Sequence, residues 1–543
     1  MAATNDESLV LQRDIMKKLI LIASLVLAIG CTTTPTTNVN TTPSGSPSPG
    51  AAASAVPYNI SLTGFQISGF PGVHSAVIAG GPEKLVVLGG RRNGLHGFPG
   101  GHDAEKGPAF PKTEANDTIY VLDLPNKKLL GSAKVATLFG TAPVGTQLKI
   151  ANQFKATNLQ YEIINGWLYV MGGYGPDAQK GTLTTLGYVT AVNFDALVNA
   201  VITNQPLDPA NTSCLDHLAL AITGGDLEWL TESSGTTLFV LAFGQQYDGE
   251  YTPSGGLVNQ NYADGVRLFT FTYPPNSAKP SGINFVTSVP NPPGTQLDPE
   301  NQFHRRDLTM KTSVDASGNR RLVAYGGVFK GGRFEGFLNP VFVTPCANTV
   351  PPCATRVAVT PNTSISQLMS QYDTAAIQLF DNTGKIMYTT LLGGISYYYW
   401  NPSTNSLKHD PLDLSKGIDG LPFINSISTL KMAIDGTGAQ YLHVGQLMPP
   451  VPATCPGQGE IVAPMGGAES KFVIASGVPQ VTPGVITLNS LTSVTSIGYL
   501  VGGINATQPY SAMGPTCASD MFYVVTINPT QPTNTIQLQA PPG

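Results

Sequence analysis

Short apolar segments that end in glycine recur along most of the chain. Most of them follow another apolar segment and a tight turn, such as Asn165-Gly166 or the turn at 435–438. Turns of this kind between apolar segments are typical of β-hairpins. The pattern therefore predicts repeated pairs of antiparallel strands. The glycine-ended segments are LVVLGG (85–90), LYVMGG (168–173), LFVLAFG (238–244), LVAYGG (322–327), TTLLGG (389–394), YLHVG (441–445) and GYLVGG (498–503).

A further strand pair is expected after most of these segments. Residues 117–130, 266–273 and 397–407 illustrate it. Each repeating unit would then hold about four antiparallel strands, which is the size of one blade of a β-propeller. The glycine-ended segments predict seven blades. Six or eight blades fit the pattern as well.

The glycine pairs, with the aromatic run YYYW (397–400) after one of them, resemble the kelch repeat. In that family the pair ends the second strand of a blade, and aromatic residues further along fill the space between blades. The resemblance covers about residues 58–543, but 238–244 and 441–445 lack the second glycine. The spacing is also irregular and longer than the usual period of about 50 residues. The resemblance implies an all-β, kelch-type β-propeller over residues 57–543.

The composition agrees with many short strands. The 543 residues include 59 Gly and 44 Pro, and only 12% are charged, about half the usual share. An array of β-sandwich domains is the alternative, but sandwiches lack a recurring second strand that ends in glycine. The net charge is −5 and no run of Lys or Arg occurs after the N-terminal segment, so no nucleic-acid partner is expected.

Residues 1–30 are expected to be a signal region. Residues 16–18 (Met-Lys-Lys) precede an apolar stretch at 19–29 and then Gly30-Cys31. A basic start before a short apolar stretch is typical of a secretory signal, and the stretch is shorter than the about 20 residues of a membrane-spanning helix. Translation is expected to begin at Met16.

The segment LAIGC (27–31) resembles the lipobox of bacterial lipoproteins, with Ala28 where Leu is usual. The resemblance implies that Cys31 receives a lipid and becomes the first mature residue. Thr32 follows it in place of Asp, which by the same resemblance favours the outer membrane of the cell envelope. An ordinary signal with an unmodified cysteine is the alternative. Residues 31–56, rich in Thr, Ser and Pro, are expected to form a disordered tether to the membrane.

The other cysteines fit an oxidising compartment. Cys346 and Cys353 bracket the turn-rich ANTVPP and are expected to form a disulfide at the end of a hairpin. Cys455 and Cys517 could form a second bridge and leave Cys214 free, although connectivity does not follow from sequence. No Cys/His cluster indicates zinc.

By resemblance to kelch propellers, residues before each first strand point toward the mouth of the central channel. Loops after the glycine ends add to the same face, and the insertions 91–117, 174–188 and 245–265 would enlarge it. Residues 303–307 (FHRRD) are the densest charged group. They predict either an Arg–Asp brace between blades, which we favour, or an anion site. The candidate binding residues are His74, Arg91, Arg92, Asn158, His304, Arg305, Arg306, Asp373 and Asn425.

No cofactor or metal is expected. The loop 95–105 holds two His and two carboxylates, but their spacing matches no standard metal site. Some kelch propellers are copper oxidases with Tyr and His ligands and a Cys–Tyr crosslink. Tyr398, Tyr399 and His409 are present, but we identify no matching Cys. No catalytic triad motif or phosphate-binding loop occurs either.

The sequence thus predicts an envelope lipoprotein whose propeller binds a protein or a glycan through its loop-rich face. The alternative is a carbohydrate-active enzyme, such as an oxidase, epimerase or lyase, with Arg305, Arg306 and His304 around an acidic sugar. A structural component of an envelope complex is a third reading. Between an enzyme and a non-enzymatic binding module, the sequence favours the binding module.

Overall fold

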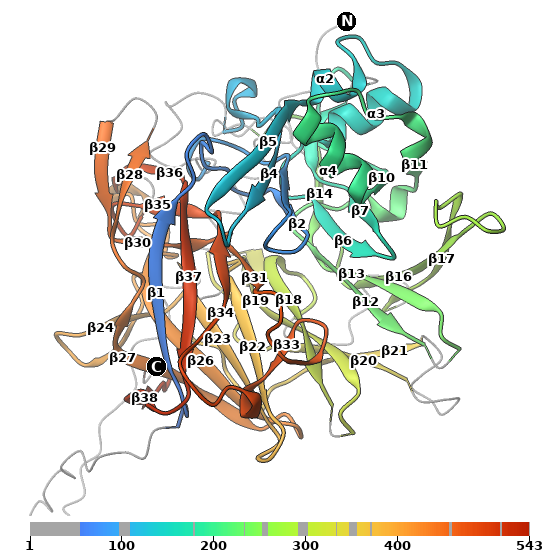
Figure 1. Cartoon of the computed structure of the whole chain (residues 1–543). Helices are drawn as coiled ribbons and strands as arrows, with labels where there is room; N and C mark the ends of the chain where they lie inside the picture. The colour runs from blue at the N-terminus through green and yellow to red at the C-terminus, as the bar shows by residue number, and fades with distance from the viewer. Residues whose placement is uncertain are drawn as a thin grey trace, which may run out of the picture. The chain divides into compact units, whose positions relative to one another are not determined.

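The computed structural model describes most of the chain after residue 54 (Figure 1). Residues 52–543 form one compact unit. The described residues are 55–96, 109–177, 180–232, 234–251, 259–290, 302–315, 317–332, 334–346, 356–369, 372–455, 459–510 and 513–541, without the side chains of Leu414 and of 451–461. The signal region, Cys31 and nearly all of the expected tether lie outside them.

Four sheets, each made of four antiparallel strands in chain order, follow one another along the first two thirds of this unit. In each sheet the first strand lies innermost, because residues at its start line a common central cavity. The first two sheets are β2 (Val77–Ala79), β3 (Leu85–Leu88), β4 (Thr118–Asp123), β5 (Lys128–Lys134), and β6 (Gln160–Ile164), β7 (Trp167–Met171), β10 (Tyr188–Asn193), β11 (Thr212–Asp216). The next two are β12 (Asp226–Thr231), β13 (Thr237–Ala242), β16 (Val266–Thr272), β17 (Gly282–Val289), and β18 (Arg306–Val314), β19 (Arg320–Val328), β20 (Val341–Pro345), β21 (Val357–Pro361).

The fifth blade is part of a wider sheet. Its four strands are β22 (Ala376–Asp381), β23 (Ile386–Ile395), β26 (Phe423–Ala433) and β27 (Gly438–Leu447). Strands β32 (Gln480–Thr482) and β33 (Val485–Thr487) extend it at one edge, and β38 (Thr535–Gln537) extends it at the other. The segment 441–445, expected to end the second strand of a blade of its own, lies instead in β27, the fourth strand of this blade.

The sixth blade closes the ring with both ends of the unit. It contains β31 (Lys471–Ile474), β34 (Thr495–Val501), β37 (Met521–Asn528) and, outermost, β1 (Asn59–Gln66). Strand β1 pairs with β37 along its whole length, from Asn59↔Asn528 to Gln66↔Met521. Figure 1 shows the blue β1 beside the red β37. The described residues therefore give six sheets of the blade type, and the predicted count of seven is not confirmed.

The six blades repeat one backbone register. In each blade a residue just before or at the start of the inner strand pairs with a residue just after the glycine end of the second strand. The pairs are His74↔Arg91, Thr157↔Tyr174, Thr223↔Gln245, Arg306↔Val328, Tyr372↔Ile395 and Ala468↔Ile504. These residues all lie at the same end of the propeller, because each is at the same place in its blade.

Insertions decorate this repeat. Helices α2 (Val135–Phe139), α3 (Gly145–Gln153) and α4 (Phe194–Thr203) pack with the first two blades into one hydrophobic core. The insertions after the second strands of blades 2 and 3 combine into an extra four-stranded sheet. Its strands are β8 (Tyr174–Asp177), β9 (Thr182–Thr185), β14 (Gln245–Asp248) and β15 (Asn259–Tyr262). Smaller sheets are β30 (Met465–Ala468), β35 (Ile504–Ala506), β36 (Thr516–Ala518); β24 (Tyr399–Asn401), β25 (Ser406–Lys408); and β28 (Val451–Cys455), β29 (Gly459–Ala463).

The cysteines are in two states. Cys346 and Cys517 are disulfide-bonded, and Cys214 is free and partly buried. Cys353 lies outside the described residues, so its pairing with Cys346 stays a prediction. Among the helices in the described ranges, none has the length and apolar character needed to cross a membrane.

Candidate functional site

A ring of six residues with positive φ surrounds the start of the central channel. Each precedes or begins the inner strand of one blade: Ser75 (51°), Asn158 (51°), Gly224 (64°), Asp307 (53°), Asp373 (22°) and Glu469 (57°). Main-chain bonds link neighbours in this ring. The N–H of Asn158 donates to the carbonyl of Ser75 at 3.0 Å, and that of Asp307 to the carbonyl of Gly224 at 2.7 Å. The N–H of Asp373 donates to the carbonyl of Asp307 at 3.1 Å.

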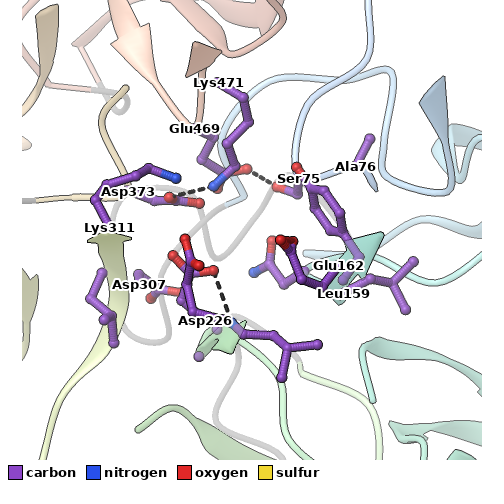
Figure 2. A pocket seen from close by; sticks show the side chains of 17 residues that line it. Ser75, Ala76, Leu159, Glu162, Asp226, Asp307, Lys311, Asp373, Glu469 and Lys471 are labelled. Carbon is purple, nitrogen blue, oxygen red and sulfur yellow. Dashed lines mark hydrogen bonds and ion pairs between the residues drawn. The ribbon is translucent and has the colours of Figure 1, made fainter. Parts of the chain in front are cut away.

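Below this ring lies an axial cavity of about 100 Å³, enough for a few water molecules. Figure 2 shows that its charged side chains converge from different blades. Carboxylates outnumber lysines in its wall. The carboxylates are Glu162, Asp226, Glu228, Asp307, Asp373 and Glu469, and the lysines are Lys311 and Lys471.

Several of these charges are already paired. Lys471 Nζ lies 2.7 Å from Asp373 Oδ1, and Arg320 Nη2 lies 2.7 Å from Glu228 Oε2. Asp226 accepts a bond of 2.7 Å from the N–H of Met310. The Ser75 hydroxyl donates to Glu469 Oε2. These contacts brace neighbouring blades around the axis.

The remaining carboxyl groups are poorly solvated. Burial raises the pKa of Glu162 to about 8, and the nearby Glu228 raises it further. Burial also raises the pKa of Asp307 to about 7; Arg306 opposes this, whereas Glu469 and Asp373 add to it. Two neighbouring carboxyl groups in a low-dielectric site do not both ionise readily. Protons therefore remain on part of this cavity at neutral pH.

A second, smaller pocket of about 20 Å³ lies at the mouth, next to the extra sheet. Asn158 and Asp307 line both pockets, so the two meet at these residues. The wall of this mouth pocket is aromatic and polar. It consists of His96, Phe110, Thr157, Asn158, Tyr174, Thr223, Gln245, Tyr247, Tyr251, Arg306, Asp307 and Tyr372.

Arg306 is the cation of the mouth pocket. Its guanidinium stacks over the Phe329 ring at 4.3 Å and hydrogen-bonds to the hydroxyls of Tyr247 and Tyr262. Its Nε lies 3.6 Å from Asp307 Oδ2, which is too far for a hydrogen bond. Although Arg306 is only 8% exposed, this Nε has no hydrogen-bond partner in the described part of the chain, nor does Thr157 Oγ1. A buried donor without a partner is costly unless a ligand or water supplies one.

Arg305 has a different role from its neighbour. It is fully buried, and it donates to the carbonyls of Gln302, Gly326 and Asn339 and to the Gln302 side chain. Its guanidinium also stacks over Phe337 at 4.4 Å. Arg305 is thus a brace inside the protein and lies outside both pockets. Among the described residues, the hydrogen-bond partners of Arg305 are carbonyl and amide oxygens of its own blade, so it does not form there the Arg–Asp brace expected for FHRRD. Arg306 lines the mouth pocket.

The other predicted site residues are divided between the mouth and its surroundings. His74 is buried, with Nδ1 2.8 Å from Ser75 Oγ and 3.3 Å from Glu469. Arg91 stacks over Phe110 at 5.0 Å, and the exposed Arg92 donates to the carbonyl of Thr113. His304 pairs with Asp264 at 2.6 Å and stacks on Tyr262 at 3.8 Å.

Asn425 was assigned to the wrong place in the repeat. It lies in β26, the third strand of blade 5, and donates to the carbonyl of Pro464 at 3.1 Å. The equivalent ring residue of the sixth blade is Glu469, which the sequence reasoning missed. Gly466-Gly467 just before it was the available signal. The mouth residues Tyr247 and Tyr262 were missed because they belong to an insertion outside the repeat.

The described part of the chain contains no group of three or more His, Cys, Asp or Glu residues placed to hold a metal ion. Most of the loop 95–105 lies outside that part. The acidic cavity thus offers single carboxylates to a ligand and no formed metal cage.

Six similar sheets around one axis, closed by the pairing of β1 with β37, define the fold as an all-β propeller. No protein-family model matches the chain, and no curated protein matches it. Among solved structures, one titled "Structure of YjhT" is similar at 12% identity and a TM-score of 0.39. The match covers 84% of this chain and 95% of that one.

Proposed function

We propose that this protein is a kelch-type propeller that binds an acidic sugar at the mouth of its channel. The observation that carries the proposal is the environment of Arg306. Its guanidinium is held by an aromatic ring and two tyrosine hydroxyls, yet its buried Nε has no hydrogen-bond partner among the described residues. A guanidinium recognises carboxylates through its planar set of donors. The aromatic wall offers faces for the apolar side of a sugar ring.

The neighbouring groups suit a polar ligand. Gln245 and Thr223 lie on the pocket wall beside Thr157, and Gln245 accepts a bond of 2.6 Å from the Gln260 amide. Amide and hydroxyl groups of this kind both donate to and accept from sugar hydroxyls. The two insertions that form the extra sheet supply much of this wall, as expected of binding residues placed on a rigid scaffold.

The decisive experiment is a thermal-shift series on the purified protein with glucuronic acid, N-acetylmuramic acid and neutral sugars. A ligand at about 100 times its Kd stabilises a fold by about 2.7 kcal/mol. We expect acidic sugars to stabilise the wild type and Arg92→Lys, because Arg92 is exposed and outside the pocket. Arg306→Lys and Tyr247→Phe should lose the effect. Stabilisation by neutral and acidic sugars alike, or by none of them, would contradict the proposal.

An enzyme of the same fold is the second candidate, and Asp307 favours it. Its carboxyl lies between the two pockets, and burial raises its pKa to about 7, close to the value that suits a general acid or base. Turnover of a bound acidic sugar, lost in Asp307→Asn while binding remains, would establish this function. Binding without turnover would support a non-enzymatic binding module instead.

We also propose that Cys31 is lipidated and holds the propeller on the cell envelope through residues 32–56. The lipobox-like LAIGC and the basic and apolar residues before it support this. The intact protein should partition into detergent, and mass spectrometry of its N-terminal peptide should show an acyl-modified Cys31. Release of the wild type into the soluble fraction, as for Cys31→Ser, would contradict the anchor.

A further inference from the structure

The two pockets differ in their charged side chains and share a wall. Arg306 is the cation above the ring of positive-φ residues, and the cavity below it is lined by six carboxylates and two lysines. Asp307 belongs to both pockets. A molecule that enters the mouth therefore meets a guanidinium first and carboxylates immediately beyond it.

The charged pair between the pockets has one long contact, and the Asp307 carboxylate also accepts a hydrogen bond from the Tyr372 hydroxyl. Arg306 Nε and Asp307 Oδ2 are 3.6 Å apart and form no hydrogen bond. On the cavity side, Asp373 and Glu469 are near enough to act electrostatically on Asp307. Lys471 is already bound to Asp373 at 2.7 Å, so it does not neutralise Asp307 directly.

We propose that the ligand is a zwitterion, an amino sugar acid whose carboxylate binds Arg306 and whose ammonium group binds Asp307. This rests on the proposed function and narrows its ligand class. Inserted between the two residues, such a ligand replaces one long charge contact with hydrogen bonds to both charges. Charge-assisted hydrogen bonds are stronger than neutral ones, particularly away from water. The ligand's ammonium also meets a cavity in which carboxylates outnumber cations, which favours positive charge there.

The position of Asp307 explains why the amine should matter. A neutral N-acetyl group in the same place would offer the Asp307 carboxylate no charge-assisted hydrogen bond and would need more room near the ring. A site built to pair a charged group rejects an analogue that lacks it, because its own buried group is then unpaired.

Four sugars separate the two charges. Muramic acid carries both a carboxylate and an ammonium group, N-acetylmuramic acid only the carboxylate, glucosamine only the ammonium group, and N-acetylglucosamine neither. Calorimetric Kd values should be measured for each with the wild type, Asp307→Asn and Glu232→Gln. Glu232 serves as the matched control, because its carboxylate pairs with Arg356 just after the end of β12, whereas the ring residue Gly224 precedes the start of that strand.

Muramic acid should bind at least about tenfold more tightly than N-acetylmuramic acid, and Asp307→Asn should remove the difference while Glu232→Gln keeps it. The opposite result is that muramic acid binds no more tightly than N-acetylmuramic acid, while N-acetylmuramic acid still binds more tightly than N-acetylglucosamine. That result would overturn the zwitterion inference but not the proposed acidic-sugar site. If neither acid binds more tightly than its counterpart without the carboxylate, both the zwitterion inference and the proposed acidic-sugar function are overturned. If Asp307→Asn does not fold, Glu469→Gln is the substitute, and it should reduce the difference because Glu469 lines the same cavity.

Discussion

The hydroxyl of Tyr58 lies 2.6 Å from Oγ1 of Thr390, a residue 332 positions further along the chain. Oγ1 of Thr390 is hydrogen-bonded to Oγ1 of Thr429 at 2.8 Å. The Thr429 hydroxyl is in turn hydrogen-bonded to Nε2 of His443 at 2.7 Å. This buried chain of bonds crosses three strands of blade 5. It ties the residue just before β1 to that blade, next to the place where β1 completes the sixth.

Tyr58→Phe should therefore weaken the closure of the propeller. The change removes one hydroxyl and leaves Thr390 with one fewer partner in a fully buried site, which costs about 1–3 kcal/mol. Denaturant unfolding of the wild type and the variant measures this difference. Tyr441→Phe is the control, because within the described ranges its hydroxyl makes no hydrogen bond. Equal losses in the two variants would show that the buried chain does not stabilise closure.

His443 at the end of the same chain should make stability fall in acid. Burial lowers its pKa to about 4 from an ordinary 6.5, although a hydrogen bond with Gln446 opposes the shift. Between these two pH values the unfolded chain binds the proton and the folded protein does not, so stability is lost as pH falls. The full loss is about 3 kcal/mol. From pH 7 to pH 4 the melting temperature should fall more steeply for the wild type than for His443→Gln. An equal fall in the two proteins would refute a role of His443 in the acid sensitivity.

Gly172 shows why the second strand must end in glycine. Its φ is +55°, and a Cβ there would lie 1.9 Å from the carbonyl oxygen of Ile222, on the chain that leads into the next blade. Gly172→Ala should therefore cost more than the about 1–2 kcal/mol of a left-handed non-glycine residue. Gly166→Ala is the matched control, because Gly166 has a φ of +76° and open space around it. Similar unfolding free energies for the two variants would mean that backbone conformation, and not contact between blades, selects the glycine.

The repeat could be predicted because each blade contains the same pattern within a short stretch of sequence. In LVVLGG and LYVMGG the glycine pair directly follows the end of β3 and of β7, and these glycines have positive φ. The segment YLHVG misled the count, since a valine before a single glycine looks the same in a fourth strand as in a second one. Pairing between β1 and β37 joins residues more than 450 positions apart and leaves no local pattern.

Only those site residues that occupy the same position in each repeat could be predicted from the sequence. His74, Asn158 and Asp373 precede inner strands as expected, because their place depends on the strand that follows. Distinguishing Arg305 from Arg306 needed the structure, because alternation along the chain sends neighbouring side chains to different surroundings. The tyrosines near Arg306 come from an insertion whose pairing into a sheet depends on two blades at once.

Glu162 should make the propeller less stable as pH rises. Burial raises its pKa from 4.5 to about 8, so between these values the folded protein holds a proton that the unfolded chain releases. Glu162→Gln removes this effect. Its melting temperature should match the wild type near pH 4.5 and exceed it increasingly up to pH 8. Glu232→Gln at the surface should show no such divergence, and an advantage of Glu162→Gln that is the same at every pH would argue against the raised pKa.

Phe110 should control entry to the mouth pocket. Its ring lies 4.9 Å from His96, 5.2 Å from Tyr174 and 5.9 Å from Tyr251. Because these rings leave a cavity of only about 20 Å³, a sugar has to displace some of them. Phe110→Ala should raise the association rate of an acidic sugar in stopped-flow experiments. It should cost less stability than the about 3–5 kcal/mol of a fully buried phenylalanine.

Phe285→Ala is the matched control for this change. Phe285 is also half-buried, but it stacks on His217 from the outer strand β17. The control should lower stability without altering the association rate. If Phe110→Ala slows association or abolishes binding, the ring forms part of the binding surface, and the space for the ligand must open elsewhere in the wall.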